Sequence, residues 1–377
     1  MSVVPVAIIG GGVVGAAVAY TLARRAVPAV LLEAEDELAR GASGTNSGIL
    51  HTGFDSKPGE LETEMIIRGA YLRPPVLEQL NVPVVHCGAR LVARGRDETA
   101  TVARVAEGAR ANGVEVAPSE DGALDVPGEA VTDPVAYTQS LAAAAAATGT
   151  EIRTCSPVTA IRQRRDGLVL EVDGSDDVAC TVAVNCAGLR ADEVARLAGD
   201  LSFGIYPRKG EFFVFDPWEP LDRILLPVPT ERTKGVLVFP TIDGKVVAGP
   251  TAVDGEDKDD WSVRDEAYAE VLDKALVMWP PLEGSTPIGS YAGLRPAGRG
   301  GANYVIGRSR ACPALINVGA IRSTGLTASL GIGERVAGLA AEAGVELGRD
   351  RPLAAGTVPA RDEPWWRRAA AQRMEER

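Results

Sequence analysis

Histidine, cysteine and long apolar runs are scarce in this chain of 377 residues, and each shortage excludes a class of site. The two histidines, His51 and His86, are too few for a histidine-rich metal centre. The five cysteines are an odd number and form no C-x-x-C pair, which argues against an iron–sulfur cluster or a disulfide framework. No apolar run approaches the roughly 20 residues of a membrane-spanning helix. We therefore expect no metal, and a reducing, cytoplasmic location.

Positive charge is also in deficit, with 39 lysines and arginines against 51 acidic residues and a net charge of −12. A nucleic-acid partner requires a basic surface, so this class is excluded. An anionic ligand would need a local cluster of cations that acts against the overall field. The N-terminus has no basic segment ahead of an apolar core, so we expect no signal peptide.

The N-terminal residues have the pattern of a β-α-β unit. Short apolar runs at 3–9 and 29–32 predict buried parallel strands, and the alanine-rich run 13–25 predicts the helix between them. The turn before the helix has the G-x-G-x-x-G spacing at Gly10, Gly12 and Gly15, with Val13 and Val14 in between. In this context the spacing predicts a dinucleotide-binding turn.

Each residue of that turn has a physical role. Gly10 makes the tight turn, Gly12 allows a pyrophosphate to approach the helix N-terminus, and Gly15 allows close packing of helix on strand. Glu33 ends the second strand, where its carboxylate can accept both ribose hydroxyls. No second G-x-G-x-x-G spacing occurs near mid-chain. A long loop of small residues, at 40–55, follows the second predicted strand. That loop suits a flavin better than a nicotinamide, so we expect FAD.

The remaining sequence predicts a second, interleaved domain. A helix is expected at 59–80, interrupted near Pro74 and Pro75, and another begins after the Asp133 cap. Runs at 212–215 and 236–239 predict sheet of the second domain. The acidic stretch 254–260 is interpreted as solvated surface, and His86 as part of a structural strand.

Six blocks resemble the D-amino-acid-oxidase-like flavoprotein superfamily, and most closely its glycerol-3-phosphate dehydrogenase/oxidase and L-2-hydroxyglutarate oxidase group. They are, in order, ASGTNSGILHTGF at 42–54, KPG at 57–59, PRKGE at 207–211, GPTA at 249–252, AGLRP at 292–296 and GAIRSTGLT at 319–327.

The resemblance implies an α/β fold: a Rossmann-type FAD-binding domain interleaved with a smaller α+β substrate domain on a mostly antiparallel sheet. We expect the FAD-binding domain at 1–80, 135–200 and 290–350, the substrate domain at 81–134 and 201–289, and a C-terminal tail at 351–377. Some relatives carry a cysteine-rich iron–sulfur module, whose pattern this sequence lacks.

The resemblance also implies the site. The expected FAD ligands are Gly10, Gly12, Val13, Val14, Gly15, Glu33, Ala42, Ser43, Thr45, Asn46, Ser47, Val158, Ala187, Gly188, Gly293, Arg322, Thr324, Gly325, Leu326 and Thr327.

The expected catalytic residues are His51, Arg295, Arg322 and Ser323. Histidine titrates near neutrality and suits a general base, so His51 is expected to take the hydroxyl proton as hydride leaves for the flavin. Arginines bind phosphate or carboxylate bidentately, so Arg295 and Arg322 are expected to bind the substrate anion. Arg208 and Lys209 are weaker candidates for the same role.

These residues lead to one preferred function and several alternatives. The preferred function is oxidation of sn-glycerol 3-phosphate to dihydroxyacetone phosphate. Oxidation of L-2-hydroxyglutarate or another 2-hydroxy acid uses the same arginines and stays open. An amino-acid oxidase would not need the histidine, and a flavin subunit that only transfers electrons within a complex is a different class. The expected electron acceptor is a quinone, oxygen or a partner protein.

The C-terminal tail has the composition of an interfacial anchor. Trp365 and Trp366 stand beside Arg367 and Arg368, with Arg373 beyond them. The sequence therefore suggests peripheral contact with the inner face of a membrane. The alternative is that both indoles pack onto the protein itself.

Overall fold

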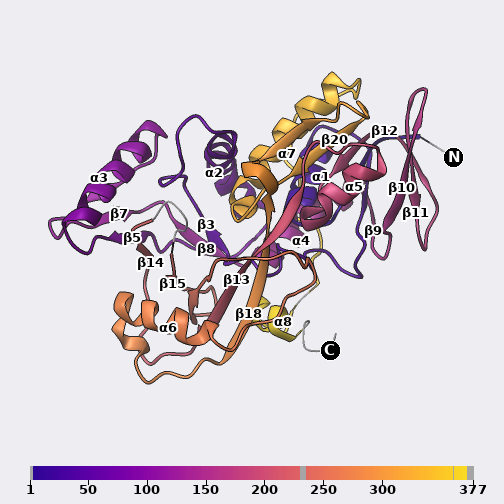
Figure 1. Ribbon diagram of the computed structural model, residues 1–377. Coiled ribbons are helices and arrows are strands. Elements are labelled where there is room, and N and C mark those ends of the chain that lie inside the picture. Colours follow the sequence, from indigo (N-terminus) through magenta and orange to yellow (C-terminus); the bar gives the residue numbers. More distant parts are fainter. Residues whose placement is uncertain (1–2, 230–234, 360, 372–377) are drawn as a thin grey trace.

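The computed structural model describes residues 3–229, 235–359 and 361–371 (Figure 1). Its first sheet has a parallel core in the strand order β9-β2-β1-β12-β20, extended by the antiparallel strands β10, β11 and β19. The strands are β1 (Val3–Ile9), β2 (Ala29–Leu32), β9 (Glu151–Arg153), β10 (Val158–Arg164), β11 (Gly167–Val172), β12 (Val178–Asn185), β19 (Val305–Arg308) and β20 (Leu315–Gly319).

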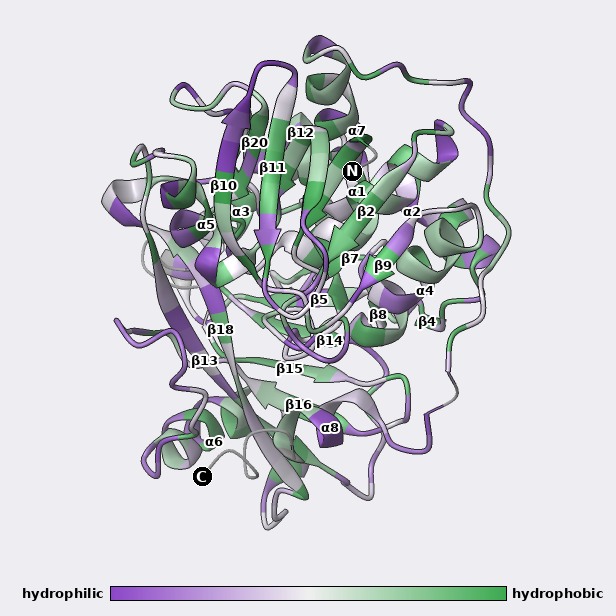
Figure 2. Ribbon diagram, turned by 90° about the vertical axis from the view of Figure 1, so that its right-hand side faces the viewer, coloured by the Kyte–Doolittle hydropathy of each residue, from purple (hydrophilic) through white to green (hydrophobic). Residues whose placement is uncertain are grey.

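Helices cover both faces of this sheet because β1 alternates its apolar side chains. Val6 and Ile8 lie in one core with α1 and α7, whereas Ala7 and Ile9 lie in another with α5. The helices of this part are α1 (Val13–Arg24), α4 (Pro134–Ala146), α5 (Ala191–Leu197), α7 (Gly325–Glu342) and the short 3-10 helix η1 (Gly188–Arg190). In Figure 2 the inner strands are hydrophobic and the edge strand β10 is hydrophilic.

The second sheet is antiparallel except where β5 runs parallel to β14. Its longest ladder joins β13 to β18, from Ile205 opposite Gly298 to Val214 opposite Gly289. The strands are β5 (Ala89–Val92), β6 (Ala117–Pro118), β7 (Leu124–Val126), β13 (Ile205–Phe215), β14 (Ile224–Pro227), β15 (Leu237–Pro240), β16 (Val246–Gly249), β17 (Val253–Asp254) and β18 (Gly289–Gly298).

The side chains of β13 alternate between the two faces of the second sheet, and different helices cover the two faces. Phe213 and Phe215 pack against α6, whereas Phe212 and Val214 face a core shared with α3 and α8. The helices of this part are α3 (Arg96–Ala111), α6 (Ala267–Met278), α8 (Trp365–Ala371), η2 (Pro280–Leu282) and η3 (Arg299–Gly301). A small sheet of β3 (Ile49–Leu50), β8 (Ala130–Thr132) and β4 (Val84–Val85) lies beside α2 (Leu61–Gln79).

Several local predictions are confirmed and others are wrong. The β-α-β unit lies where the sequence predicts it, and Asp133 caps α4 by accepting from the amides of Val135 and Ala136. The predicted interruption of α2 is wrong, because the helix continues through Pro74 and Pro75. Both prolines are exposed, so their rings project toward solvent while the flanking buried residues keep the helix packed. His86 lies one residue beyond β4 and is exposed.

The expected domain boundaries stay a prediction. One observation bears on the last of them: β18 lies within the range 290–350 expected for the FAD-binding domain, apart from its first residue, yet it pairs with β13 of the second sheet. The chain therefore crosses between the two sheets at the end of β18.

Of the two alternatives for the tail, the structure agrees with packing onto the protein, because Trp365 and Trp366 are 2% and 1% exposed in the core of the second sheet. The Trp365 ring makes an edge contact with Tyr291, and Trp366 Nε1 donates to Asp243. Arg373 lies outside the described residues. Among the helices that the structure describes, none is long and apolar enough to cross a membrane.

Candidate functional site

The glycine turn after β1 allows backbone to approach backbone. Gly10 has a φ of 107°, and a Cβ there would lie 2.5 Å from the carbonyl oxygen of Cys186. A Cβ on Gly15 would lie 1.9 Å from the carbonyl oxygen of Gly10, so only glycine fits at either position. Ser43 Oγ accepts from the amide of Val13 at 2.9 Å, which fixes the small-residue loop against the start of α1.

Glu33 lies where the second strand ends, beside that turn. Its Oε2 accepts from the Gly11 amide at 2.5 Å and its Oε1 from the Glu35 amide at 3.0 Å. Burial raises the pKa of the Glu33 carboxyl, although these backbone hydrogen bonds act in the opposite direction. The carboxylate is therefore oriented before any ligand arrives.

A groove of about 750 Å³ runs over the turn. Residues from the part built on the first sheet and from the part built on the second sheet line it. The expected ligands that line it are Gly10, Gly12, Val13, Val14, Glu33, Ala42, Ser43, Asn46, Val158, Ala187, Gly188, Arg322, Gly325 and Leu326.

A second cavity of about 840 Å³ adjoins this groove. The expected residues that line it are Ala42, Thr45, Asn46, Ser47, His51, Gly293, Arg295, Arg322, Ser323 and Thr324. Ala42, Asn46 and Arg322 line both spaces, so the groove and the cavity form one continuous site. Two expected ligands line neither: Gly15 packs against Gly10, and Thr327 Oγ1 accepts from the His51 amide.

The acidic stretch 254–260 is mostly exposed, as expected, but it also forms ion pairs that the sequence did not reveal. The charged loop, residues 254–262, connects the two parts of the fold, and Lys258, Asp259 and Trp261 line the groove. Lys258 Nζ donates to Asp192 and Glu193, each at 2.7 Å, and Asp259 accepts from Arg190.

On the other side of the charged loop, Lys209 Nζ donates to Asp260 at 2.6 Å and Arg208 donates to Asp254 at 3.1 Å. Sequence reasoning missed this loop because its partners lie on other elements, far away in the chain. The pairing engages both of the weaker anion-binding candidates, Arg208 and Lys209, with carboxylates of the protein.

His51 is bound to a carboxylate that the sequence did not reveal. Its Nδ1 lies 2.9 Å from Glu129 Oε2, and the Glu129 side chain is fully buried. Seventy-eight positions separate the two residues, so no local pattern joins them. The small sheet brings them together, because β3 precedes His51, β8 follows Glu129, and the two strands pair.

Arg295 lies on the cavity wall with its guanidinium directed into backbone carbonyls. Nε donates to the oxygen of Arg208 at 3.1 Å, and Nη2 donates to those of Lys209 and Thr251 at 3.0 and 2.7 Å. Burial, reinforced by the nearby charge of Arg208, lowers the pKa of Arg295 to about 10. No carboxylate forms an ion pair with Arg295 within residues 3–229, 235–359 and 361–371. Arg295 is thus a buried cation without a bonded counter-ion.

Arg322 differs from Arg295 because it has a carboxylate partner, Glu62 on α2. Glu62 also accepts from Asn303 and Thr324. Burial raises the pKa of the Glu62 carboxyl, but the charge of Arg322 and these hydrogen bonds outweigh burial and hold the pKa below its ordinary value. Arg322 has a φ of 50°, unusual for a residue with a side chain. Of the two arginines expected to bind the substrate anion, only Arg295 has no carboxylate partner among the described residues.

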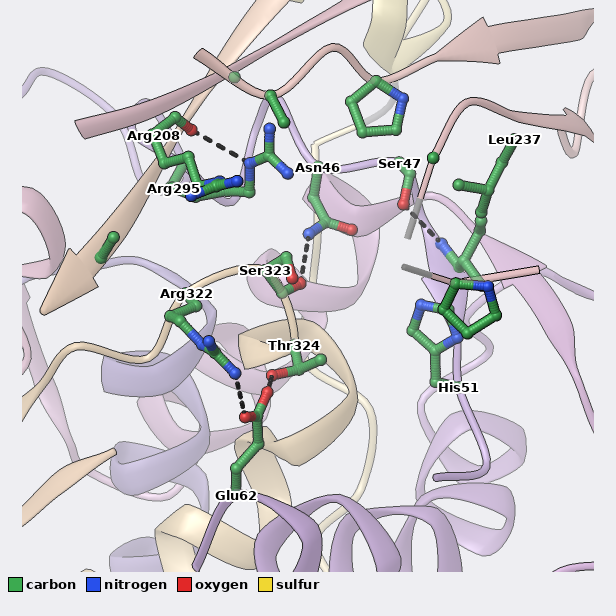
Figure 3. Close-up of a pocket in the computed structure, with 18 of the residues that line it drawn as sticks. Asn46, Ser47, His51, Glu62, Arg208, Leu237, Arg295, Arg322, Ser323 and Thr324 are labelled. Carbon is green, nitrogen blue, oxygen red and sulfur yellow. Dashed lines mark hydrogen bonds and ion pairs between the residues drawn. The ribbon is translucent and has the colours of Figure 1, made fainter. Parts of the chain in front are cut away.

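The remaining polar groups lie between these cations and the histidine. In the view of Figure 3, Arg208 and Arg295 lie on one side of Asn46 and Ser47, and His51 lies on the other. Asn46 Nδ2 donates to the Ser323 carbonyl at 3.5 Å. Apolar side chains from the second sheet complete the wall, among them Leu91, Phe212, Leu226, Leu237 and Phe239. Such a mixture of apolar wall and few polar groups is typical of a small-molecule site.

Comparison with known proteins agrees with this geometry. The family model for FAD dependent oxidoreductases matches residues 5–339. Glycerol 3-phosphate dehydrogenase from Caloramator mitchellensis is 28% identical over 342 residues, covering 86% of this chain and 71% of that protein. L-2-hydroxyglutarate dehydrogenase from Salmonella houtenae is 28% identical over 286 residues, covering 71% of this chain and 68% of that protein.

A solved structure, dithionite-reduced L-alpha-glycerophosphate oxidase from Mycoplasma pneumoniae with FAD bound, superimposes with a TM-score of 0.86 at 26% identity. The match covers 96% of this chain and all of that chain. The residues present fit FAD. The glycine turn allows close approach of a ligand, Glu33 lines the groove, and the buried Thr45 Oγ1 has no hydrogen-bond partner in the described structure. The match of the family model over residues 5–339 identifies this chain as a member of the FAD-dependent oxidoreductase family.

Proposed function

We propose that this enzyme oxidises sn-glycerol 3-phosphate to dihydroxyacetone phosphate. One observation carries the proposal: the buried guanidinium of Arg295 has no bonded carboxylate among the described residues and shares a cavity with His51. A buried cation without a counter-ion is costly, and an anionic substrate would offset that cost. The cation and the base at one site match a substrate with a phosphate and a secondary alcohol.

FAD and the residues of the cavity each have a separate role in the reaction. Bound FAD supplies the acceptor for the hydride that leaves the carbinol carbon. His51 accepts the hydroxyl proton on Nε2 as the C–O bond becomes a carbonyl, so the substrate loses two electrons and two hydrogens in total. Arg295 binds the phosphate through Nη1, the nitrogen that none of its backbone contacts uses.

The fold adds a second source of positive potential. Helix α7 begins at Gly325, which lines the groove, and Thr324 before it lines the cavity. The N-terminus of a long helix carries partial positive charge and favours an anion. Arg295 and this terminus together supply the local positive field that a chain of net charge −12 needs.

L-2-hydroxyglutarate is the second candidate substrate, and one observation favours it. Arg208 lines the cavity next to Arg295, so two cations are present for a substrate with two carboxylates. Arg208 is paired with Asp254, however, whereas Arg295 has no such partner. We therefore rank the substrate with one anionic group first.

Anaerobic mixing decides between the two substrates. The FAD-loaded enzyme is mixed with sn-glycerol 3-phosphate, with L-2-hydroxyglutarate or with glycine, and the flavin absorbance is followed. We expect rapid bleaching by sn-glycerol 3-phosphate. Bleaching by L-2-hydroxyglutarate alone would replace the first proposal with the second, and bleaching by glycine alone would reject both.

The same sample then identifies the electron acceptor. Admitting oxygen, a water-soluble quinone or neither to the bleached enzyme separates the acceptors proposed for this chain. Recovery of the flavin absorbance in oxygen would indicate an oxidase. Recovery with quinone alone would indicate a dehydrogenase, and recovery with neither would leave a partner protein as the acceptor.

A further inference from the structure

The contacts of Glu129 carry an inference that rests on the proposed function and extends it. We propose that Glu129 is a positioning residue that fixes His51 in the tautomer with hydrogen on Nδ1. The other ring nitrogen, Nε2, is then unprotonated and has no hydrogen-bond partner among the described residues. Only this tautomer can accept a proton from a substrate in the cavity that His51 lines.

The hydrogen-bond donors around Glu129 determine this tautomer. Oε1 accepts from the Thr52 amide at 2.6 Å and from the Thr52 hydroxyl at 2.8 Å, which leaves Oε2 for His51. An ionised carboxylate accepts hydrogen bonds and donates none. The hydrogen in the contact between Glu129 and His51 must therefore belong to Nδ1.

The backbone of His51, from which the imidazole extends, is held by two further elements. The His51 amide donates to Thr327 Oγ1 on α7 at 3.0 Å, and the His51 carbonyl accepts from Arg73 Nη2 on α2 at 3.3 Å. Arg73 is 6% exposed, and its charge interacts with that of the fully buried Glu129. Arg73 thus offsets the charge of a buried carboxylate whose hydrogen-bond partners in the described structure are only Thr52 and His51.

The hydrogen bond between His51 and Glu129 also stabilises the product of proton transfer. When the substrate hydroxyl gives its proton to Nε2, the ring becomes an imidazolium and keeps its hydrogen on Nδ1. The contact with Glu129 then joins a cation to an anion, which strengthens a hydrogen bond that already exists. Glu129 itself takes no proton, as in other carboxylate–histidine pairs.

Replacing Glu129 with glutamine gives a distinctive test. The Thr52 amide still requires an acceptor, so the glutamine oxygen should face Thr52 and the glutamine NH₂ should face His51. Nδ1 would then have to accept, and the hydrogen would move to Nε2, which removes the base. Glu129→Gln should therefore reverse the tautomer rather than merely loosen the ring.

Nitrogen NMR reads the tautomer directly because the chain has only two histidines. The FAD-loaded protein, labelled with ¹⁵N-histidine and carrying His86→Gln, shows His51 alone. At a pH where the imidazole is neutral, we expect protonated Nδ1 with Glu129 present and protonated Nε2 in Glu129→Gln. A wild-type ring protonated on Nε2, or an unchanged tautomer in the variant, would overturn the proposal.

Rapid mixing with sn-glycerol 3-phosphate or L-2-hydroxyglutarate supplies the second readout. Glu129→Gln should slow flavin reduction about 10²–10⁴-fold with little change in the substrate concentration that gives half the limiting rate. Glu78→Gln, an exposed carboxylate on α2, should match the wild type. Wild-type reduction by Glu129→Gln overturns the proposal. If the variant does not bind FAD, the wild-type tautomer alone decides.

The two proposals fail in different ways. If neither probe bleaches the wild-type flavin, the proposed function is wrong, but the tautomer measurement still supports or rejects the role of Glu129. If a probe bleaches the flavin and the tautomer is reversed from our expectation, the function stands and the role of Glu129 is wrong.

Discussion

Glu62 and Arg322 form an ion pair at the place where the groove and the cavity meet. The pair comes from elements far apart in the chain: Glu62 from the first turn of α2, and Arg322 from the segment that joins β20 to α7. Since Arg322 has a φ of 50° and lines both spaces, Glu62 helps to stabilise the segment ahead of α7.

The first prediction concerns Glu62→Gln. The pKa of Glu62 is lowered in the folded protein, so its ionised form stabilises the fold above the unfolded-state pKa, and this contribution disappears as the pH falls through the folded-state value. We expect the variant to lose about 1–3 kcal/mol of unfolding free energy at pH 7. The difference should shrink as the pH falls below about 4.5. Urea unfolding at several pH values measures it, with Glu60→Gln as the control. A difference independent of pH would contradict the prediction.

The second prediction concerns His51→Gln. Glutamine keeps a polar side chain in the cavity but cannot take a proton, so FAD binding should be unchanged. Flavin reduction by substrate should slow about 10²–10⁴-fold, the usual contribution of a positioned base. Anaerobic rapid mixing measures the limiting rate. Reduction at nearly the wild-type rate would return His51 to a structural role.

The third prediction concerns Arg295→Ala. The change removes the buried cation of the cavity, and a charge-assisted contact contributes about 1.5–3 kcal/mol. The value of kcat/KM should therefore fall by roughly one to two decades. Arg162→Ala, at a side chain that is 73% exposed, is the matched control. An unchanged kcat/KM would mean that the anion binds elsewhere, with Arg208 the next candidate.

Local patterns predicted much of the first sheet and of the groove. The short apolar run of β1 and the spacing of Gly10, Gly12 and Gly15 are encoded within a few residues, so both could be recognised. The partners of the expected site residues could not, because Glu129 and Glu62 approach His51 and Arg322 only through the tertiary fold. In a sequence, nothing distinguishes the carboxylate that contacts His51 from one in an exposed loop.

The fourth prediction concerns the charged loop, residues 254–262. Lys258 pairs with Asp192, whose side chain is 3% exposed, at the edge of the groove. Lys258→Met keeps the length of the side chain but removes its ion pairs with Asp192 and Glu193. Since a pair of this kind contributes about 1 kcal/mol, FAD release should become roughly fivefold faster. The rise of flavin fluorescence on release measures the rate, and Lys274→Met on α6 is the control. Equal rates in the two variants would mean that the loop does not retain the cofactor.

The last prediction concerns the tail. Trp366 is 1% exposed, and its ring packs against Gly289 of β18, where an added Cβ would lie 3.1 Å away. Removing a buried tryptophan leaves a cavity and costs about 3–5 kcal/mol. Trp366→Ala should therefore lower the unfolding free energy by that amount. Trp218→Ala, at a side chain that is 84% exposed, should change it by no more than about 0.5 kcal/mol. Chemical unfolding followed by circular dichroism compares the two variants.

Because both indoles of α8 lie inside the protein, a chain truncated after Pro364 should lose stability without losing affinity for anionic vesicles. If Trp366→Ala were as stable as Trp218→Ala, α8 would not be packed in the core. If only the full chain sedimented with vesicles, α8 would have to leave the core and bind the membrane.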